Sequence, residues 1–391
     1  MNLLITFIFI NSFISFIYFN IYNYFFINII LFCIYFFFIY LYVIEYINNN
    51  NLILFEKYFI LILSSIPIIL IIFCKNIFWI IFLLETQSFI ILGNSTIFNR
   101  YNNQIIKKIE GSLIYLLPSF ISFFLISLSL ILISYYNEKK IWNYNLITLG
   151  LIIKMGNIPF HFWVNQVINK ISHNTIILFN SLNKISIIFI LSIIPHNSFI
   201  IIFFGLISII FGILLIINTI FIKEFIAFSS IISSGWIIIF VVFQKWTILF
   251  LFFLIYTCSL CIILKLSEKI FFIYEFKEKI SYFKNNNIRN ILFIISILNI
   301  AGIPPLIGFL IKFLIIKNFF YYFHITFNII FIIIIISSIF PYIRPLLYNY
   351  SNSIKKKYFL KKEKKIQNIN IILLINILFN LLFFNIKYFF I

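Results

Sequence analysis

The sequence predicts an all-α fold, a polytopic transmembrane helical bundle, and three observations lead to this class. Hydrophobic residues make up 63% of the 391 positions and charged residues only 10%, whereas a soluble domain has about 25% charged residues. The apolar residues stand in runs of about 20, the length of a helix that crosses a bilayer. These runs lack the alternation of a β-barrel, and helices satisfy their own backbone hydrogen bonds in lipid.

Thirteen runs predict spans. Two of them precede the polar stretch at 46–51, ten lie between 52 and 348, and the last follows a lysine-rich stretch at 355–365. The sixth and the eleventh contain Gly and Pro and are expected to be broken. The predicted ranges are 3–20, 24–45, 52–74, 77–97, 111–134, 144–163, 174–194, 198–218, 224–243, 246–265, 290–316, 326–348 and 369–390.

The pattern of spans also repeats along the chain. A shift of 145 residues moves the run at 52–74 onto 198–218 and Pro159 onto Pro304. Each unit then holds five helices, so the second copy is inverted in the membrane, as in many transporters. The predicted parts are N-terminal helices at 1–50, two inverted five-helix repeats at 51–196 and 197–348, and a basic loop with a final helix at 349–391.

The formal net charge of +19 comes from basic residues that lie between the apolar runs. If the chain alternates sides, most of these residues gather on one face, which the positive-inside rule assigns to the cytoplasm or the mitochondrial matrix. We therefore expect a topology signal and no nucleic-acid partner. The lysines of 355–365 are interpreted as a solvated loop, with a site for lipid headgroups such as cardiolipin as the alternative.

The composition points to the origin of the chain. It has no Asp, two Ala and three Arg against 56 Phe, a bias that indicates an AT-rich genome of organellar type. We therefore expect a multi-pass protein of the mitochondrial inner membrane. Cys258 and Cys261 form a pair, but no second pair completes a four-ligand metal site, so the four cysteines are interpreted as packing residues.

Four charged residues stand near the middle of apolar runs: Glu85, Lys154, Lys184 and Lys312. Each costs about 2.5 to 3.5 kcal/mol at a helix centre on insertion scales, so a buried partner or a water-filled path is expected. For Lys184 and Lys312 the alternative is a side chain that reaches the lipid headgroups. Glu85 is too short for that.

Two of these charges lie beside predicted helix breaks. Proline removes a backbone donor and frees carbonyl groups, and broken helices at repeat-related positions indicate an ion path. A packing kink without a transport role remains the alternative for either break. The residues that predict the breaks are Gly156, Pro159, Gly302, Pro304 and Pro305.

The chemistry expected of these residues is proton transfer. A lysine that is removed from water holds its proton less firmly, and a nearby carboxylate strengthens that hold, so one lysine can both load and release. His161 stands alone beside the first break, which does not suit a two-haem cytochrome. We expect no redox cofactor and no metal in this chain.

Four stretches resemble the antiporter-like proton-pumping subunits of respiratory complex I, in order and spacing from about residue 52 to 348. The broken helix with its lysine and PFHFW ending is the most specific of them. The stretches are WIIFLLETQSF (79–89), LGLIIKMGNIPFHFW (149–163), KEFIAFSSIISSGW (223–236) and NIAGIPPLIGFLIK (299–312).

This resemblance implies a role for each buried charge. Glu85 would modulate the charge of Lys154, the proton-loading lysine. Lys184, in FNSLNKISI, would pass the proton on, and Lys312 would stand towards the exit. The family usually has Tyr and His where this chain has Phe228 and Ser233, so one relay group is expected to be absent here or replaced by water.

The resemblance further implies a membrane-arm core subunit of complex I that translocates protons and takes part in NADH:ubiquinone reduction without redox chemistry of its own. Flavin and iron–sulfur clusters are then expected in partner subunits. The expected partners are other membrane-arm subunits, accessory subunits and membrane lipids. Two alternatives stay open: a cation/proton antiporter subunit and a structural membrane spacer that has lost pumping.

Overall fold

The structure is a computed structural model, and it describes residues 63–351. The gaps in this range are 69, 72, 75, 98–101, 137–140, 195–196, 220, 245, 269–286, 305 and 323–324. The predicted spans at 3–20, 24–45 and 369–390 lie outside the described residues, as does Pro305. The described residues form helices and turns and no strand, which agrees with the predicted helical class.

The helices follow the predicted runs closely. They are α4 (Ile77–Ile97), α5 (Asn102–Tyr136), α6 (Ile141–Met155), α7 (Phe162–Lys170), α8 (His173–Leu178), the π-helix η2 (Phe179–Asn183), α9 (Lys184–Ile193), α10 (Ser198–Ile217), α11 (Ile222–Val242), α12 (Trp246–Glu268), α14 (Asn287–Ala301), α15 (Ile307–Tyr322) and α16 (Ile325–Ser351). Five of the described helical segments are long and apolar enough to cross a membrane. The total of thirteen spans stays a prediction.

The run predicted at 174–194 is helical throughout but not uniform. A π turn at Phe179–Asn183 separates α8 from α9. A π turn holds one extra residue and leaves a backbone carbonyl without its usual helical donor. Hydropathy cannot predict such a turn, because the residues on both sides are equally apolar.

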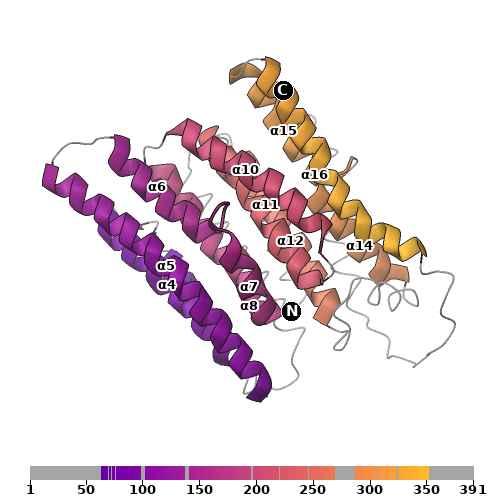
Figure 1. Cartoon of the computed structure of the whole chain (residues 1–391), viewed down its shortest axis with the longest axis horizontal. Coiled ribbons are helices and arrows are strands. Elements are labelled where there is room, and N and C mark those ends of the chain that lie inside the picture. Colours follow the sequence, from indigo (N-terminus) through magenta and orange to yellow (C-terminus); the bar gives the residue numbers. More distant parts are fainter. Residues whose placement is uncertain are drawn as a thin grey trace, which may run out of the picture. The chain divides into compact units, whose positions relative to one another are not determined.

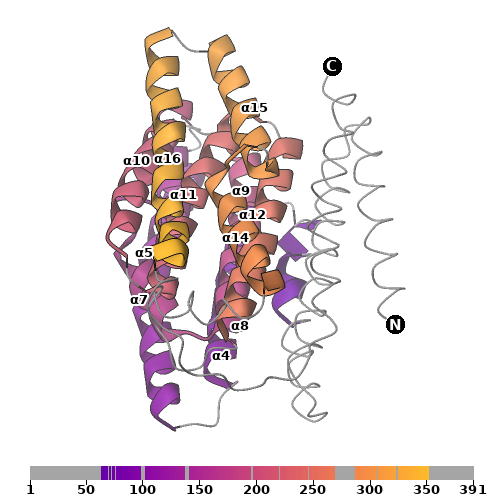
Figure 2. The same cartoon turned by 90° about the vertical axis from the view of Figure 1, so that its right-hand side faces the viewer.

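The chain divides into two compact units, each described by itself. The first comprises 1–208 with 233–250, and the second comprises 209–232 with 251–391. In the first unit α5 lies alongside α4 and α6 (Figure 1). In the second unit α14, α15 and α16 lie side by side, with their axes upright in Figure 2. The division into two inverted repeats stays a prediction.

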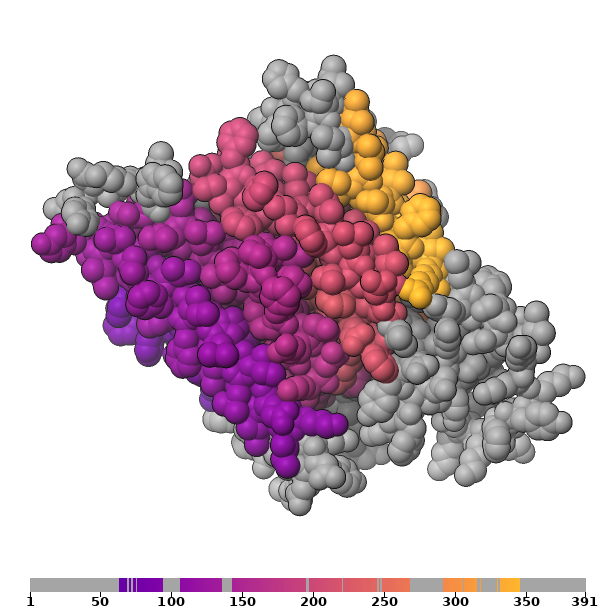
Figure 3. All heavy atoms as spheres, in the orientation of Figure 1, coloured from indigo at the N-terminus to yellow at the C-terminus, as the bar shows by residue number. Residues whose placement is uncertain are grey.

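Exposure separates helices that face outward from helices that form the core. Only 28% of the apolar window of α5 and 39% of that of α10 is buried, against 89% for α8–α9, α11 and α12. In Figure 3 the purple atoms of the α4–α5 region form part of the outer surface. Leu117, Phe124 and Ile131 of α5 are each more than half exposed. An outward apolar face of this kind suits lipid or a neighbouring membrane protein.

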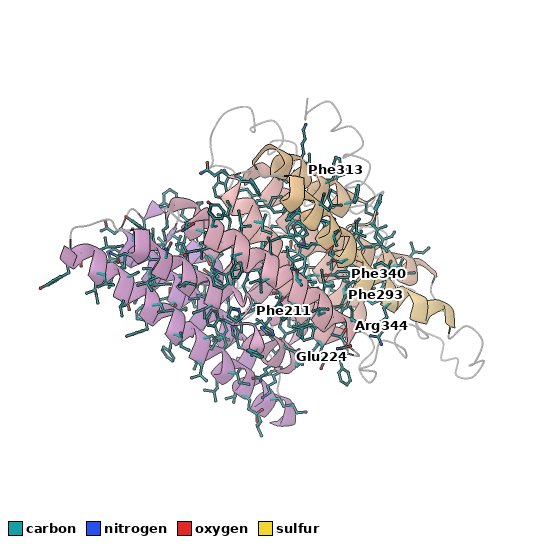
Figure 4. All side chains as sticks on the ribbon, turned by 45° about the horizontal axis from the view of Figure 1, so that its top comes forward. Phe211, Glu224, Phe293, Phe313, Phe340 and Arg344 are labelled. Atoms are coloured by element: carbon teal, nitrogen blue, oxygen red, sulfur yellow. The ribbon has the colours of Figure 1, made fainter. Side chains whose placement is uncertain are left out.

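Four phenylalanines of the second unit illustrate the same separation (Figure 4). Phe293 on α14 is buried, whereas Phe211, Phe313 and Phe340 are at least half exposed. Phe340 is 70% exposed although it belongs to an apolar helix. In water such exposure would be costly, so these side chains are suited to a hydrocarbon environment.

Candidate functional site

A buried ion pair joins α4 and α6. The Lys154 Nζ lies 2.6 Å from the Glu85 Oε1, and the side chains are 1% and 11% exposed. The same ammonium group approaches the Leu84 carbonyl at 3.4 Å. The Ser88 hydroxyl donates to the Glu85 Oε2 at 3.3 Å. The two charges compensate each other at a depth where either alone would cost several kcal/mol.

The first helix break follows Lys154 directly. Gly156 has φ of 74°, its N–H donates to the Ile153 carbonyl at 3.0 Å, and the N–H of Asn157 donates to the Ile152 carbonyl at 3.3 Å. These two bonds form a Schellman motif, which ends a helix with a left-handed residue. A Cβ on Gly156 would collide with Val164 and Trp163. Glycine is therefore required here both for backbone conformation and for space.

The chain then turns before α7 begins. The N–H of Phe160 donates to the Asn157 carbonyl at 2.7 Å, and Pro159 follows a cis peptide bond. His161 lies in this turn with its ring against Phe162. Among the described residues no group of three or more His, Cys, Asp or Glu side chains is placed to hold a metal.

Lys184 is the first residue of α9 and is 4% exposed. Its Nζ donates to the Ser233 hydroxyl of α11 at 3.4 Å. Ser233 is one of the positions where this chain departs from the family pattern that it resembles. The serine therefore still offers Lys184 an oxygen, although the distance is at the long limit of a hydrogen bond.

Gln87 connects the ion-pair helix with the π turn. Its Nε2 donates to the Leu182 carbonyl at 2.8 Å, and both residues are buried. Leu182 belongs to η2, whose backbone departs from the regular α-helical hydrogen-bond pattern. A side chain two residues beyond Glu85 thus binds the turn that ends immediately before Lys184.

Lys312 lies at the second break, within the second unit. Gly302 again has φ of 74°, and the N–H of Ile303 donates to the Leu298 carbonyl at 3.3 Å. Lys312 is 2% exposed. Its Nζ donates to the Ala301 carbonyl at 2.7 Å and to the Ser338 hydroxyl at 3.5 Å. The ammonium thus lies at the C-terminal end of α14, where the helix dipole favours a positive charge.

The two breaks share the conformation of their glycine and one turn bond, although the N–H of Gly156 donates to the Ile153 carbonyl and that of Gly302 to the Leu298 carbonyl. Gly156 and Gly302 have the same φ, and the turn bond from Phe160 to Asn157 corresponds to the bond from Leu306 to Ile303. These positions are related by one residue more than the predicted shift of 145. Pro304 lies in the second turn.

The sequence-predicted residues are therefore distributed as follows. Glu85 and Lys154 are in direct contact, Lys184 lies in the same unit against Ser233, and Lys312 is bound to the break of the second unit. Ser88, Gln87 and Ser338 were not predicted. Their only sequence signal is a polar side chain within an apolar run, and many serines here simply bond to a carbonyl of their own helix.

Comparisons with known proteins agree with the resemblance. The family model for the transmembrane region of NADH:quinone oxidoreductases and Mrp antiporters matches residues 95–339. NADH-ubiquinone oxidoreductase chain 2 of Anopheles gambiae is 28% identical over 217 residues, which are 54% of this chain and 62% of that protein. Chain 2 of Gallus gallus is 26% identical over 175 residues, 44% of this chain and 50% of that protein. The chain thus spans between half and 62% of the length of these relatives.

Two solved structures share the fold. A chain of respiratory complex I from Thermus thermophilus matches with a TM-score of 0.74 at 14% identity. The matched region covers 90% of this chain and 83% of the Thermus chain. A chain of the Mrp complex from Dietzia sp. DQ12-45-1b matches with a TM-score of 0.59 at 14% identity. This match covers 78% of this chain and 61% of the Dietzia chain. The matched model, the relatives and the fold agree, and the chain belongs to the NADH:quinone oxidoreductase/Mrp antiporter transmembrane family.

Proposed function

We propose that this chain is a membrane-arm subunit of respiratory complex I that moves protons across the mitochondrial inner membrane. The observation that carries the proposal is the buried Glu85–Lys154 pair in front of a broken helix. An ion pair in this environment has few structural advantages, because apolar residues of similar volume would be as stable or more stable. Its presence in an apolar bundle is better explained by charge movement.

Within complex I, subunit 2 is the identity that the observations favour. The similar curated proteins are named chain 2. A lysine at position 312 also fits the pattern of subunit 2 better than that of subunit 4, where the family tends to place a glutamate. The matching conformations of Gly156 and Gly302 support two related five-helix repeats.

The proposed cycle begins at the ion pair. Quinone reduction in other subunits shifts the Glu85–Lys154 pairing, so Lys154 releases the proton that Glu85 had stabilised on its amine. Lys184 takes up this proton while Ser233 accepts a hydrogen bond from its ammonium group. Lys312 acts towards the exit, where the Ala301 carbonyl and the Ser338 hydroxyl stabilise its charged form.

The chain contributes no redox chemistry in this proposal. NADH oxidation and ubiquinone reduction take place at the flavin and iron–sulfur clusters of partner subunits, and this chain is the proton-translocating part of the enzyme. Its partners are the other membrane-arm subunits, accessory subunits and lipids such as cardiolipin. The lysines of 355–365 lie outside the described residues.

Purification tests this assignment. The chain is expected to copurify with flavin, iron–sulfur clusters and NADH:ubiquinone reductase activity, and vesicles with that particle should acidify on one side when NADH is added. A cation/proton antiporter subunit would instead give sodium-dependent proton exchange in a particle without flavin. The Mrp likeness keeps this second candidate in view, although its TM-score is lower, 0.59 against 0.74.

A further inference from the structure

Helix α4 carries two buried polar side chains that reach different elements. Glu85 extends to Lys154 of α6, and Gln87, which is fully buried, extends to the π turn η2. Successive residues of an α-helix are turned by about 100°, so side chains two residues apart point in nearly opposite directions. α4 therefore meets the ion pair on one side and η2 on the other, and it also lies alongside α8 and α9.

The hydrogen bond from Gln87 holds the backbone shortly before Lys184. The Gln87 Nε2 donates to the Leu182 carbonyl at 2.8 Å, and the Ser186 hydroxyl approaches the same carbonyl at 3.5 Å. Ser186 belongs to the helix that follows the turn, whereas Gln87 is 95 residues away from Leu182 in the sequence. A buried hydrogen bond is costly to break, because no water replaces the lost partner. The place of Leu182, and with it that of Lys184, is therefore tied to α4.

The turn that Gln87 binds determines the direction of Lys184. η2 (Phe179–Asn183) is a π turn, in which the backbone holds one residue more than an α-helix of the same length. The N–H of Lys184 donates to the Ser181 carbonyl, three residues before it. Gain or loss of one residue in a turn rotates the side chains that follow by about 100°. The conformation of η2 thus decides whether the Lys184 ammonium reaches the Ser233 hydroxyl, 3.4 Å away.

We propose that Gln87 is a positioning residue that makes Lys184 respond to changes in the ion pair between α4 and α6. This inference rests on the proposed function, in which that pair changes during the cycle. Because α4 moves as a rigid helix, a shift that withdraws Glu85 from its partner also displaces Gln87. The Leu182 carbonyl follows its hydrogen-bond donor, and Lys184 moves with the π turn. Gln87 itself neither gains nor loses a proton.

The test removes this one hydrogen bond in the assembled complex. Gln87→Met keeps the length of the side chain and removes the amide. We expect NADH-driven proton translocation in vesicles to fall roughly three- to tenfold, the effect of one buried hydrogen bond. Thr86→Val is the matched control and should translocate normally, because the Thr86 hydroxyl donates to the Leu83 carbonyl of its own helix. Equal rates in Gln87→Met and Thr86→Val would overturn the proposal.

Two further measurements separate positioning from a purely structural role. A density map of the Gln87→Met complex should keep the 2.6 Å contact of the ion pair and show the Lys184 Nζ withdrawn from the Ser233 hydroxyl. Gln87→Met combined with Ser233→Ala should translocate no more slowly than Gln87→Met alone, because the contact that the second substitution removes is already lost. An unmoved Lys184, or losses that multiply in the double variant, would contradict the positioning role.

Lys154→Met distinguishes this inference from the function on which it rests. If Lys154→Met translocates protons normally, the proposed function itself fails. If Lys154→Met abolishes translocation and Gln87→Met leaves it unchanged, the proposed function stands and the positioning role of Gln87 is wrong.

Discussion

The two helix breaks have a glycine in the same conformation but bind their lysines differently. At the first break Lys154 lies before Gly156 and binds the Glu85 carboxylate of another helix. At the second break Lys312 lies after Gly302 and returns to it, binding the Ala301 carbonyl. One charge is compensated by an opposite charge, and the other by a helix end and a hydroxyl group.

This difference has a functional consequence under the proposed function. A carboxylate partner can move away or change its own charge, so the proton affinity of Lys154 is adjustable. The Ala301 carbonyl and the Ser338 hydroxyl, which accept hydrogen bonds from Lys312, carry no charge to remove. The first break is therefore suited to coupling with a distant reaction, because the proton affinity of its lysine can change. The second break is suited to a step in which the proton affinity of the lysine stays constant.

The largest expected effect comes from breaking the ion pair. Lys154→Met should abolish proton translocation and destabilise the chain by about 3 to 5 kcal/mol, because Glu85 is left buried without its partner. Thermal unfolding and vesicle acidification measure the two effects. Lys170→Met is the matched control, since the Lys170–Glu110 pair is also 3.0 Å or closer but is 33% and 51% exposed. If Lys170→Met lost as much stability and translocation as Lys154→Met, burial of the ion pair would not explain the effect.

The double variant Glu85→Gln with Lys154→Met sharpens this prediction. Removing both charges should restore most of the stability, because no buried charge remains, while translocation stays absent. Stability that stays as low as in Lys154→Met would mean that packing, and not charge, explains the loss.

The second effect in size concerns the glycines. Gly156→Ala and Gly302→Ala each force alanine into a left-handed conformation, at a cost of about 1 to 3 kcal/mol. Gly156→Ala should be worse, because the new Cβ meets Val164 and Trp163, whereas at Gly302 it meets the flexible Lys312 side chain at 3.0 to 3.1 Å. Gly93→Ala, with nothing within 4 Å of its Cβ, should leave unfolding temperature unchanged. A larger destabilisation by Gly302→Ala than by Gly156→Ala would contradict this prediction.

Lys312→Met is expected to be milder for stability than Lys154→Met. It leaves a carbonyl at a helix end and a hydroxyl that already bonds to the Ile335 carbonyl of its own helix. We expect a loss of about 1 to 2 kcal/mol together with loss of translocation. A destabilisation as large as that of Lys154→Met would indicate that Lys312 has a buried charged partner.

The smallest effect is expected at Ser233. Ser233→Ala removes a hydrogen bond of 3.4 Å to Lys184, so translocation should fall by no more than about threefold. Ser230→Ala is the control, because the Ser230 hydroxyl donates to the Ala227 carbonyl of its own helix. A complete loss in Ser233→Ala would assign this serine a direct part in the proton path.

Much of the fold could be predicted from local sequence. The breaks before Asn157 and Ile303 follow from Gly residues that end helices in the left-handed conformation. The contact between Ser233 and Lys184 could not be predicted, because 49 residues separate them and hydropathy does not encode which helices are neighbours. The π turn was also missed, and so was the hydrogen bond from Gln87 to Leu182 within it, because 95 residues separate these two.

The sequence by itself determined the helical class, the break positions and the four charges inside apolar runs, because bilayer length, backbone restriction and the cost of charge in lipid are local properties. Only the tertiary structure decided that Lys154 is paired with Glu85, that Lys184 lies against Ser233, and that Lys312 binds its own break. Such pairings depend on how helices pack and rotate against each other. In an apolar chain many packings bury similar area, and the few polar contacts distinguish between them.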